Sequence, residues 1–150
     1  YNHFKDKKHL IKEVILLGEK KLFNVILIEK KKSKITTEQL RLIAKAYLKF
    51  ATEEKALFNL MFSKDNKELL HLCEKIMLQF KLIIIEKFKK GKRFKLTAKG
   101  SAITAWSMIH GIAVTLNNSN KENLESMWHI ELKNIVREMS AIWGKGVSEK

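Results

Sequence analysis

The sequence contains no proline and only one cysteine among its 150 residues. Without proline, nothing of that kind forces a break in a long helix. The single Cys73 rules out an internal disulfide and fits a reducing compartment, so we expect a cytoplasmic protein. No stretch is both long and uncharged enough to span a bilayer, and the start has no signal-peptide pattern. A membrane is therefore not an expected partner.

Arginine is also scarce, although the chain carries a net charge of +14. Arg41, Arg93 and Arg137 are the only arginines, and every other basic residue is lysine. Clustered lysines favour polyanion partners because they release counterions from a phosphate backbone. Arginine, however, is the usual reader of bases and the usual bidentate phosphate clamp. We therefore interpret most of the lysine as solvated surface, with a basic helical module for RNA or a membrane surface as a lesser alternative.

No catalytic constellation is evident in the sequence. The six glycines are scattered and form no phosphate-binding loop. Glu125 and His129 lie four residues apart on a predicted helix, but a zinc site normally shows more ligands. We therefore predict no catalytic residues, no metal site and no cofactor, and we do not expect an enzyme.

Apolar residues recur at helical spacing along most of the chain, which predicts an all-α fold with six main helices. The length suits one domain with a sizeable core. Asp6 is a good cap for a first helix that runs from Lys7 to about Glu29. Thr36 and Gln39 have the spacing of a capping box at the start of the second helix.

The stretch from Leu82 to Thr97 is ambiguous. Its three consecutive isoleucines favour a strand, and Lys90-Gly91-Lys92 is a plausible turn, so it resembles the wing of a winged-helix repressor. The same isoleucines also continue the preceding helical stripe, with Gly91 as the helix stop and Thr97 as the next cap. The alternative function is therefore a winged-helix DNA-binding regulator with a basic wing at Lys87–Lys99.

The segment Ala98–Leu116 is apolar on nearly every side and rich in small residues. A helix of that kind must be covered on several faces, and its small residues permit another helix to approach closely. A turn at Asn117–Asn120 and a last apolar stripe from Leu124 to Trp143 follow, ended by Gly144 and Gly146. Two consecutive apolar helices joined by a short polar turn suit an antiparallel dimer bundle.

Three stretches resemble the tetracycline-repressor (TetR) family, in the same order along the chain. Tyr1–Leu10 (YNHFKDKKHL) resembles the family's exit from its helix-turn-helix. Ala46–Phe62 resembles an Ala-Tyr-x-x-Phe-Ala helix followed by an Ala-Leu-aromatic helix that ends in Met-Phe. Ala105–Gly111, with its Trp-x3-His-Gly motif, resembles the family's first dimerisation helix. The resemblance implies a TetR-like helical ligand-binding domain that dimerises through a four-helix bundle of its last two helices.

The resemblance also implies a domain organisation and a function. Residues 1–5 would be the remnant of a helix-turn-helix DNA-binding domain, and residues 6–150 the ligand-binding and dimerisation domain. The protein would be a transcriptional regulator, most simply a repressor, that binds a small, largely apolar effector and releases operator DNA. Operator DNA would be bound by the missing N-terminal part. Tyr1 and Lys7 take positions that usually touch DNA phosphate, and a helix N-terminus at Lys7 also favours an anion.

Aromatic and methionine side chains on four predicted helices form the candidate effector site. Such side chains with one or two polar groups suit an apolar ligand. Trp106 and His110 lie four residues apart and should face the same space, where each needs a hydrogen-bond partner. The predicted ligand-binding residues are Tyr47, Phe50, Phe58, Met61, Phe62, Met77, Phe80, Trp106 and His110. The predicted homodimer interface comprises Ala102, Ala105, Ile109, Ala113, Leu124, Trp128, Ile135 and Met139.

Overall fold

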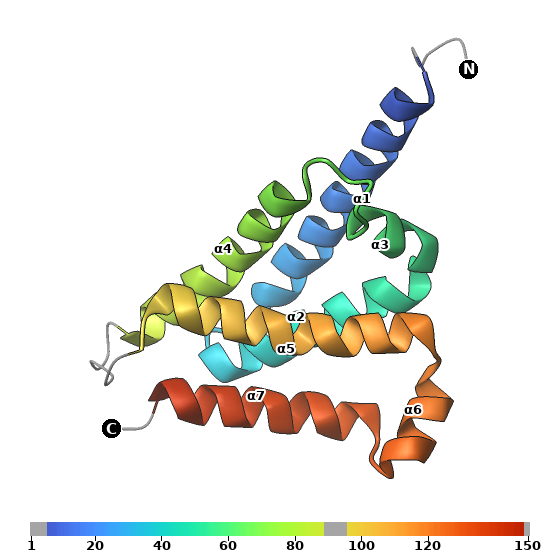
Figure 1. Ribbon diagram of the computed structural model, residues 1–150. Helices are drawn as coiled ribbons and strands as arrows, with labels where there is room; N and C mark the ends of the chain where they lie inside the picture. The colour runs from blue at the N-terminus through green and yellow to red at the C-terminus, as the bar shows by residue number, and fades with distance from the viewer. Residues whose placement is uncertain (1–5, 89–95, 149–150) are drawn as a thin grey trace.

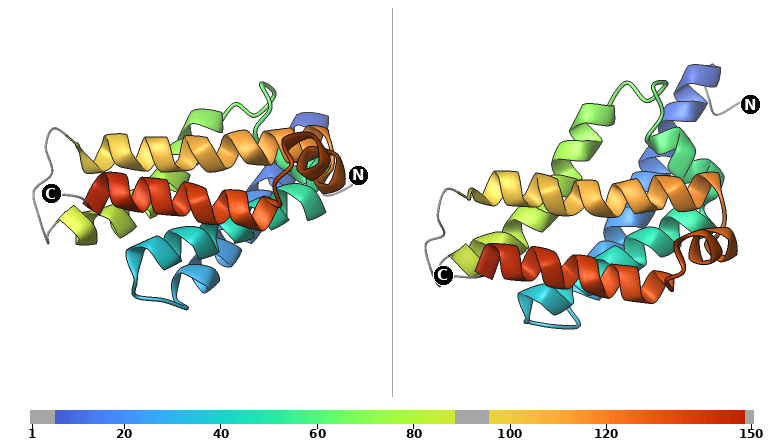
Figure 2. Two further views of the ribbon diagram at one scale, coloured as in Figure 1. Left: turned by 90° about the horizontal axis from the view of Figure 1, so that it is seen from below. Right: turned by 60° about the horizontal axis from the view of Figure 1, so that its bottom comes forward.

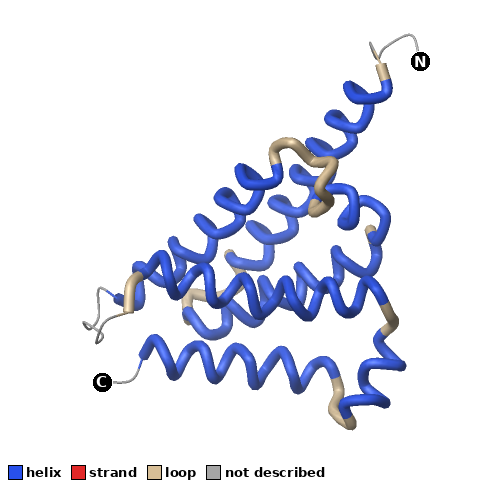
Figure 3. Tube along the Cα trace, viewed as in Figure 1, coloured by secondary structure: helices blue, strands red, loops and turns tan. Residues whose placement is uncertain are grey.

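The computed structural model describes residues 6–88 and 96–148, which form seven helices and no strand (Figures 1 and 3). The all-α prediction is confirmed. The helices are α1 (Lys7–Lys30), α2 (Thr36–Glu53), α3 (Lys55–Met61), α4 (Leu69–Phe88), α5 (Ala98–Asn118), α6 (Lys121–Trp128) and α7 (Leu132–Ser148).

Helix α1 begins where the sequence predicts. The Asp6 side chain accepts a hydrogen bond from the His9 backbone N–H at 2.8 Å, which satisfies one of the free donors at the helix start. The predicted cap is therefore confirmed. The buried residues of α1 are Ile15, Gly18, Leu22 and Ile26, three or four positions apart, so one stripe of the helix faces the core.

The capping box predicted for α2 is wrong. Thr36 is already the first helical residue, and Ile35 before it makes no side-chain capping bond. The Gln39 amide instead donates to the backbone oxygen of Lys30 at 3.2 Å. That carbonyl is one of the acceptors left without an intrahelical partner at the end of α1. The short connection between the two helices brings it within reach of Gln39.

Helix α2 lies at the centre of the molecule. It contacts α1, α3, α4, α5 and α7, so it is covered on several sides (Figure 2). Its sequence explains this position, because its buried residues extend well beyond a single stripe. They are Leu40, Ile43, Ala44, Tyr47, Leu48, Phe50 and Ala51.

The first half of the ambiguous stretch is helical, because α4 continues to Phe88. Of the two alternatives left open for this stretch, the helical one is confirmed for residues 82–88 and the strand is wrong there. Ile83 and Ile84 are buried and extend the stripe formed by Ile76 and Phe80, so burial outweighs the strand preference of isoleucine. Gly91 and most of the proposed wing at 87–99 lie outside the described residues. Thr97 caps α5 as predicted, since its hydroxyl accepts from the Gly100 N–H at 3.0 Å.

The last apolar stripe forms two helices, so the expectation of one long final helix is wrong. His129 has a φ of 52°, in the left-handed region, and this ends α6. Glu125 then accepts a hydrogen bond from the Leu132 backbone N–H at 2.7 Å, which caps the start of α7. Gly144, predicted as a helix end, lies inside α7 and is buried against Thr37 of α2, where a larger residue would collide.

Helices α5 and α7 lie side by side and run in opposite directions on one side of the molecule (Figures 1 and 2). The Trp143 indole of α7 donates to the Ser101 backbone oxygen of α5 at 3.1 Å. Small buried residues of α5, such as Ala102 and Ala105, permit its close packing on α2 and α4.

Gly18 sets the close approach of α1 to α3. A Cβ atom added at Gly18 would lie 2.6 Å from Met61 Sδ and 2.8 Å from Leu57 Cδ1. We predict that Gly18→Val lowers the free energy of unfolding by about 1–3 kcal/mol, because it overpacks this contact. Chemical denaturation measures the change. Ala56→Val is the matched control, since Ala56 is an exposed helical residue of α3. Equal effects of the two variants would contradict the prediction.

Candidate functional site

Five of the nine predicted ligand-binding residues meet in one aromatic cluster. Tyr47 comes from α2, Phe58 from α3, and Phe62 directly follows α3, while Trp106 and His110 come from α5. The ring centroids of Phe62 and His110 are 4.7 Å apart, and those of Trp106 and His110 are 5.0 Å apart. Tyr47 and Phe58 meet edge to face at 5.9 Å. These separations are typical of favourable ring contacts.

A hydrogen-bond network lies inside the cluster. The Tyr47 hydroxyl is 2.8 Å from His110 Nδ1, and the Trp106 indole N–H donates a longer bond of 3.4 Å to the Tyr47 oxygen. The prediction that Trp106 and His110 face the same space is confirmed by their stacked rings. Both polar groups find a partner within the chain, and that partner is the same tyrosine hydroxyl.

Burial keeps Tyr47 and His110 uncharged. Burial lowers the pKa of His110 and raises the pKa of Tyr47 far above its ordinary value, so both groups are neutral near pH 7. The Tyr47 oxygen accepts from Trp106, and in one of the two imidazole tautomers its own proton is donated to His110 Nδ1. A neutral imidazole that accepts at Nδ1 carries its proton on Nε2. The site is therefore an uncharged polar pair in an aromatic shell.

Of the remaining four predicted residues, three belong to the core and Met77 does not. Phe50, Met61 and Phe80 are buried, and Met77 is partly exposed. Met61 is directed to α1, since its sulfur is the atom nearest to a Cβ added at Gly18.

The cluster has a closed side and a more open side. Tyr47 and Phe58 are fully buried, whereas Phe62, Trp106 and His110 keep some exposure to solvent. Access from solvent is therefore by way of Phe62 and the Trp106–His110 face of α5.

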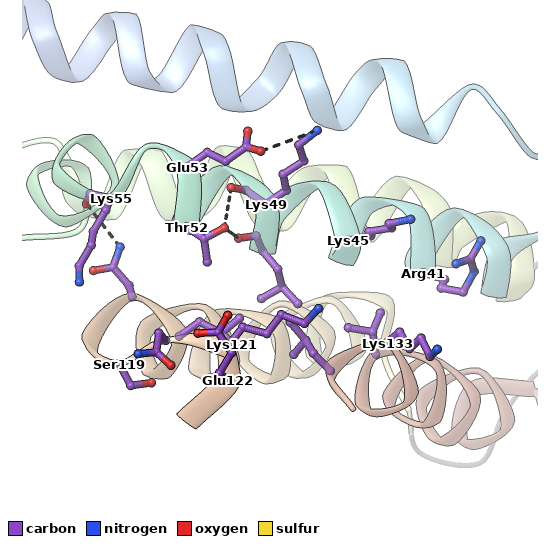
Figure 4. A pocket seen from close by; sticks show the side chains of 16 residues that line it. Arg41, Lys45, Lys49, Thr52, Glu53, Lys55, Ser119, Lys121, Glu122 and Lys133 are labelled. Carbon is purple, nitrogen blue, oxygen red and sulfur yellow. Dashed lines mark hydrogen bonds and ion pairs between the residues drawn. The ribbon is translucent and has the colours of Figure 1, made fainter. Parts of the chain in front are cut away.

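A cavity of about 730 Å³ lies at a different place, between α2, the α5–α6 junction and α7 (Figure 4). None of the nine predicted ligand-binding residues lines it. Sequence reasoning missed this site. The available signal was the spacing of Arg41, Lys45 and Lys49, which places three basic residues on one face of α2.

The residues predicted to contact DNA phosphate are placed only in part. Lys7 is exposed at the first position of α1. Tyr1 lies outside the described residues. Figure 1 shows the N-terminal end of α1 projecting beyond the other helices, so Lys7 lies away from the aromatic cluster.

Most of the residues predicted for the dimer interface are buried within the single chain. Ala102, Ala105, Ile109, Ala113, Leu124 and Met139 belong to its own core. Ile135 is partly exposed and Trp128 is exposed. The exposed large apolar residues of α5, α6 and α7 are instead Ile103, Val114, Met127, Trp128 and Ile142. Small buried residues and small interface residues have the same sequence pattern, so the pattern did not separate them.

These features define an all-helical domain with a polar pair enclosed by aromatic side chains. The sequence matches the family described as "Tetracyclin repressor-like, C-terminal domain" over residues 40–125, more than half of the chain. The chain therefore belongs to this family. No curated protein and no solved structure shows significant similarity to it. Among the helices that the structure describes, none is long and apolar enough to cross a membrane.

The lowered pKa of His110 predicts a pH dependence of stability. The unfolded chain binds a proton at this histidine below about pH 6.5, whereas the folded chain resists it. The free energy of unfolding should therefore fall as the pH decreases from 7.5 to 5.5. In His110→Gln the fall should be smaller, because the titrating group is gone. Urea denaturation at both pH values measures the difference, and an unchanged pH dependence in the variant would contradict the assignment.

Proposed function

We propose that this chain is the regulatory domain of a TetR-family transcription factor and that a small, largely apolar effector binds at the aromatic cluster. The observation that carries the proposal is the Tyr47–His110–Trp106 network within a shell of phenylalanine rings. Aromatic surfaces with a few fixed polar groups are typical of sites for small apolar molecules. The rings supply contact area, and the polar pair orients the ligand.

The effector would enter by way of the partly exposed rings. Phe62 and Trp106 border the cluster and are the side chains that must move to admit a ligand. A ligand hydroxyl or carbonyl would then exchange with the Trp106 N–H or with the Tyr47–His110 bond. Leaving these groups without a partner costs about 1–3 kcal/mol each, so a fully apolar ligand that disrupts the network is disfavoured.

The contact at Gly18 is the proposed route of the signal. Phe58 of the cluster and Met61 beside Gly18 lie on the same short helix, α3. A ligand that displaces α3 therefore moves the surface on which α1 rests. Helix α1 would lead to an operator-binding segment, with Lys7 and Tyr1 near DNA phosphate. An effector acts only through unequal affinity for the two α1 positions, and in a repressor it would favour the one that releases DNA.

A pair of probes that differ by one hydroxyl tests the effector site. We predict that 1-naphthol binds more tightly than naphthalene, because its hydroxyl bonds to the Tyr47–His110 pair. In Tyr47→Phe the preference should fall by up to about tenfold, while the affinity for naphthalene is retained. Isothermal titration calorimetry measures the affinities, and the Trp106 indole resonance in NMR spectra locates the probe.

The naphthalene affinity serves as the internal control, since Tyr47→Phe changes the hydroxyl and keeps the ring. The proposal fails if neither probe binds. It also fails if both bind without perturbing the Trp106 resonance.

We also propose that the chain forms a homodimer through the outward faces of α5 and α7. Gly111 of the Trp-x3-His-Gly motif is exposed, with open space around its Cα. A glycine there lets a second helix approach closely. Ile103 and Val114 flank it on the same face of α5, and Ile142 of α7 is 65% exposed. These exposed residues, with Trp128, are better candidates for the interface than the buried alanines.

The dimer proposal predicts that Gly111→Arg lowers the self-association of the chain at least tenfold. The large charged side chain has room in the single chain but blocks a close helix approach. Sedimentation velocity over a range of concentrations gives the dimer fraction. Ala56→Arg on α3, also exposed, is the matched control and should leave self-association unchanged. A monomeric wild-type chain at high concentration would overturn the proposal.

A further inference from the structure

We propose that the cavity between α2, the α5–α6 junction and α7, here called the basic groove, is a second ligand site. Its ligand class is an amphipathic anion, with an apolar chain and a carboxylate or phosphate head. The groove shares no residue with the aromatic cluster, so this inference does not depend on the proposed effector site.

The floor of the groove is apolar. Leu48 of α2, Leu116 of α5 and Val136 of α7 are each at most 6% exposed, and Leu132 at the start of α7 is partly exposed. The cavity of about 730 Å³ is within the size range of small-molecule sites. An apolar chain laid on this floor removes its own surface from water, together with the little that the floor still exposes.

The rim of the groove is strongly basic. Figure 4 shows Arg41 and Lys45 along α2 and Lys133 across from them on α7, while the Lys49 ammonium points to the other side of α2, toward Glu53. Lys55 and Lys121 complete a set of six basic residues, against Glu53 and Glu122 as the two acidic ones. An anionic head at the rim is therefore attracted, while its apolar chain reaches the floor.

Existing ion pairs leave part of this charge available. Arg41 pairs with Glu38 and Lys133 with Glu131. In the longer contacts of 3.9 Å, Lys49 approaches Glu53 and Lys121 approaches Glu125. Exposed ion pairs of this kind contribute little to stability, so a competing anion can displace the carboxylate from the lysine or arginine.

Lys45 is the residue that should hold the anionic head. Within residues 6–88 and 96–148, neither Lys45 nor Lys55 forms an ion pair. Of these two, Lys45 lies one turn from Arg41 on α2, with Lys133 of α7 across the groove.

The wall of the groove also holds an unsatisfied polar group. Asn117 is 1% exposed, and its amide N–H donates to the Ala51 backbone oxygen at 2.8 Å. Its side-chain oxygen has no hydrogen-bond partner in the described part of the chain. Buried acceptors are normally paired, so Asn117 marks a polar position in the wall beside the apolar floor.

The combination favours an amphipathic small molecule over a nucleic acid. A phosphate backbone would contact the lysines and leave the leucine and valine floor unoccupied. An amphipathic anion contacts the lysines with its head and the floor with its chain. The basic residues are mostly lysines, which attract an anion as point charges, and a single carboxylate or phosphate head suits them.

Decanoate is the first probe, used below its micelle-forming concentration, with decyl phosphate as the second anionic head and decanol as the neutral analogue. We expect both anions to bind and decanol to bind at least tenfold more weakly. Lys45→Glu should weaken decanoate binding roughly tenfold or more. Lys64→Glu, an exposed lysine outside the groove, is the matched control and should leave it unchanged. Calorimetry measures these affinities.

Methyl NMR locates the bound probe. Decanoate should shift the methyl resonances of Leu48, Leu116, Leu132 and Val136 and leave the Trp106 indole resonance in place. Four results would each overturn the proposal: no binding of either anion, equal binding of decanol, equal affinity in Lys45→Glu, or shifts at Trp106 without shifts in the groove. Failure of the naphthol experiment has no bearing on this one, because the two sites share no residue.

Discussion

The central constraint on this fold is that α2 must be covered on several sides at once. Its seven buried residues include Tyr47, so a polar hydroxyl is buried together with the apolar side chains of the helix. The other helices are arranged by this requirement, since α1, α5 and α7 each pack on a different part of α2. A hydroxyl in such a place needs partners, and α5 supplies both of them, Trp106 and His110, from two consecutive turns.

This arrangement makes the position of α5 specific. Alanine and isoleucine packing alone tolerates small rotations of a helix, whereas a shared hydrogen-bond network tolerates them poorly, because each broken bond leaves a buried polar group unpaired. The Tyr47 hydroxyl therefore sets the register between α2 and α5. The same turns of α5 present Gly111 outward, so the interior network and the outward face are oriented together.

Much of the fold was predictable from local signals. The Asp6 and Thr97 caps and the shared face of Trp106 and His110 follow from spacing alone, and the structure has all three. Features that depend on tertiary contacts were not predictable. Gln39 bonds to the end of α1 instead of its own helix, and the left-handed His129 divides a continuous apolar stripe. The basic groove escaped prediction because residues 41–55 on one side of it lie more than 60 positions from residues 116–136 on the other. Burial of the α5 alanines depends on which neighbours cover them.

The contact of α1 with α3 has a mechanical consequence. At 1.5 Å per residue, the part of α1 from Gly18 back to Lys7 is a rigid arm about 16 Å long. A tilt of about 5° at the Gly18 contact displaces the tip of that arm by roughly 1.4 Å, by the same helix geometry. At Gly18 no α1 side chain lies between the two helices, so no side chain there can change its rotamer to compensate for such a tilt. Because Gly18 has no side chain, the crossing of α1 and α3 is a rigid pivot for tilting α1.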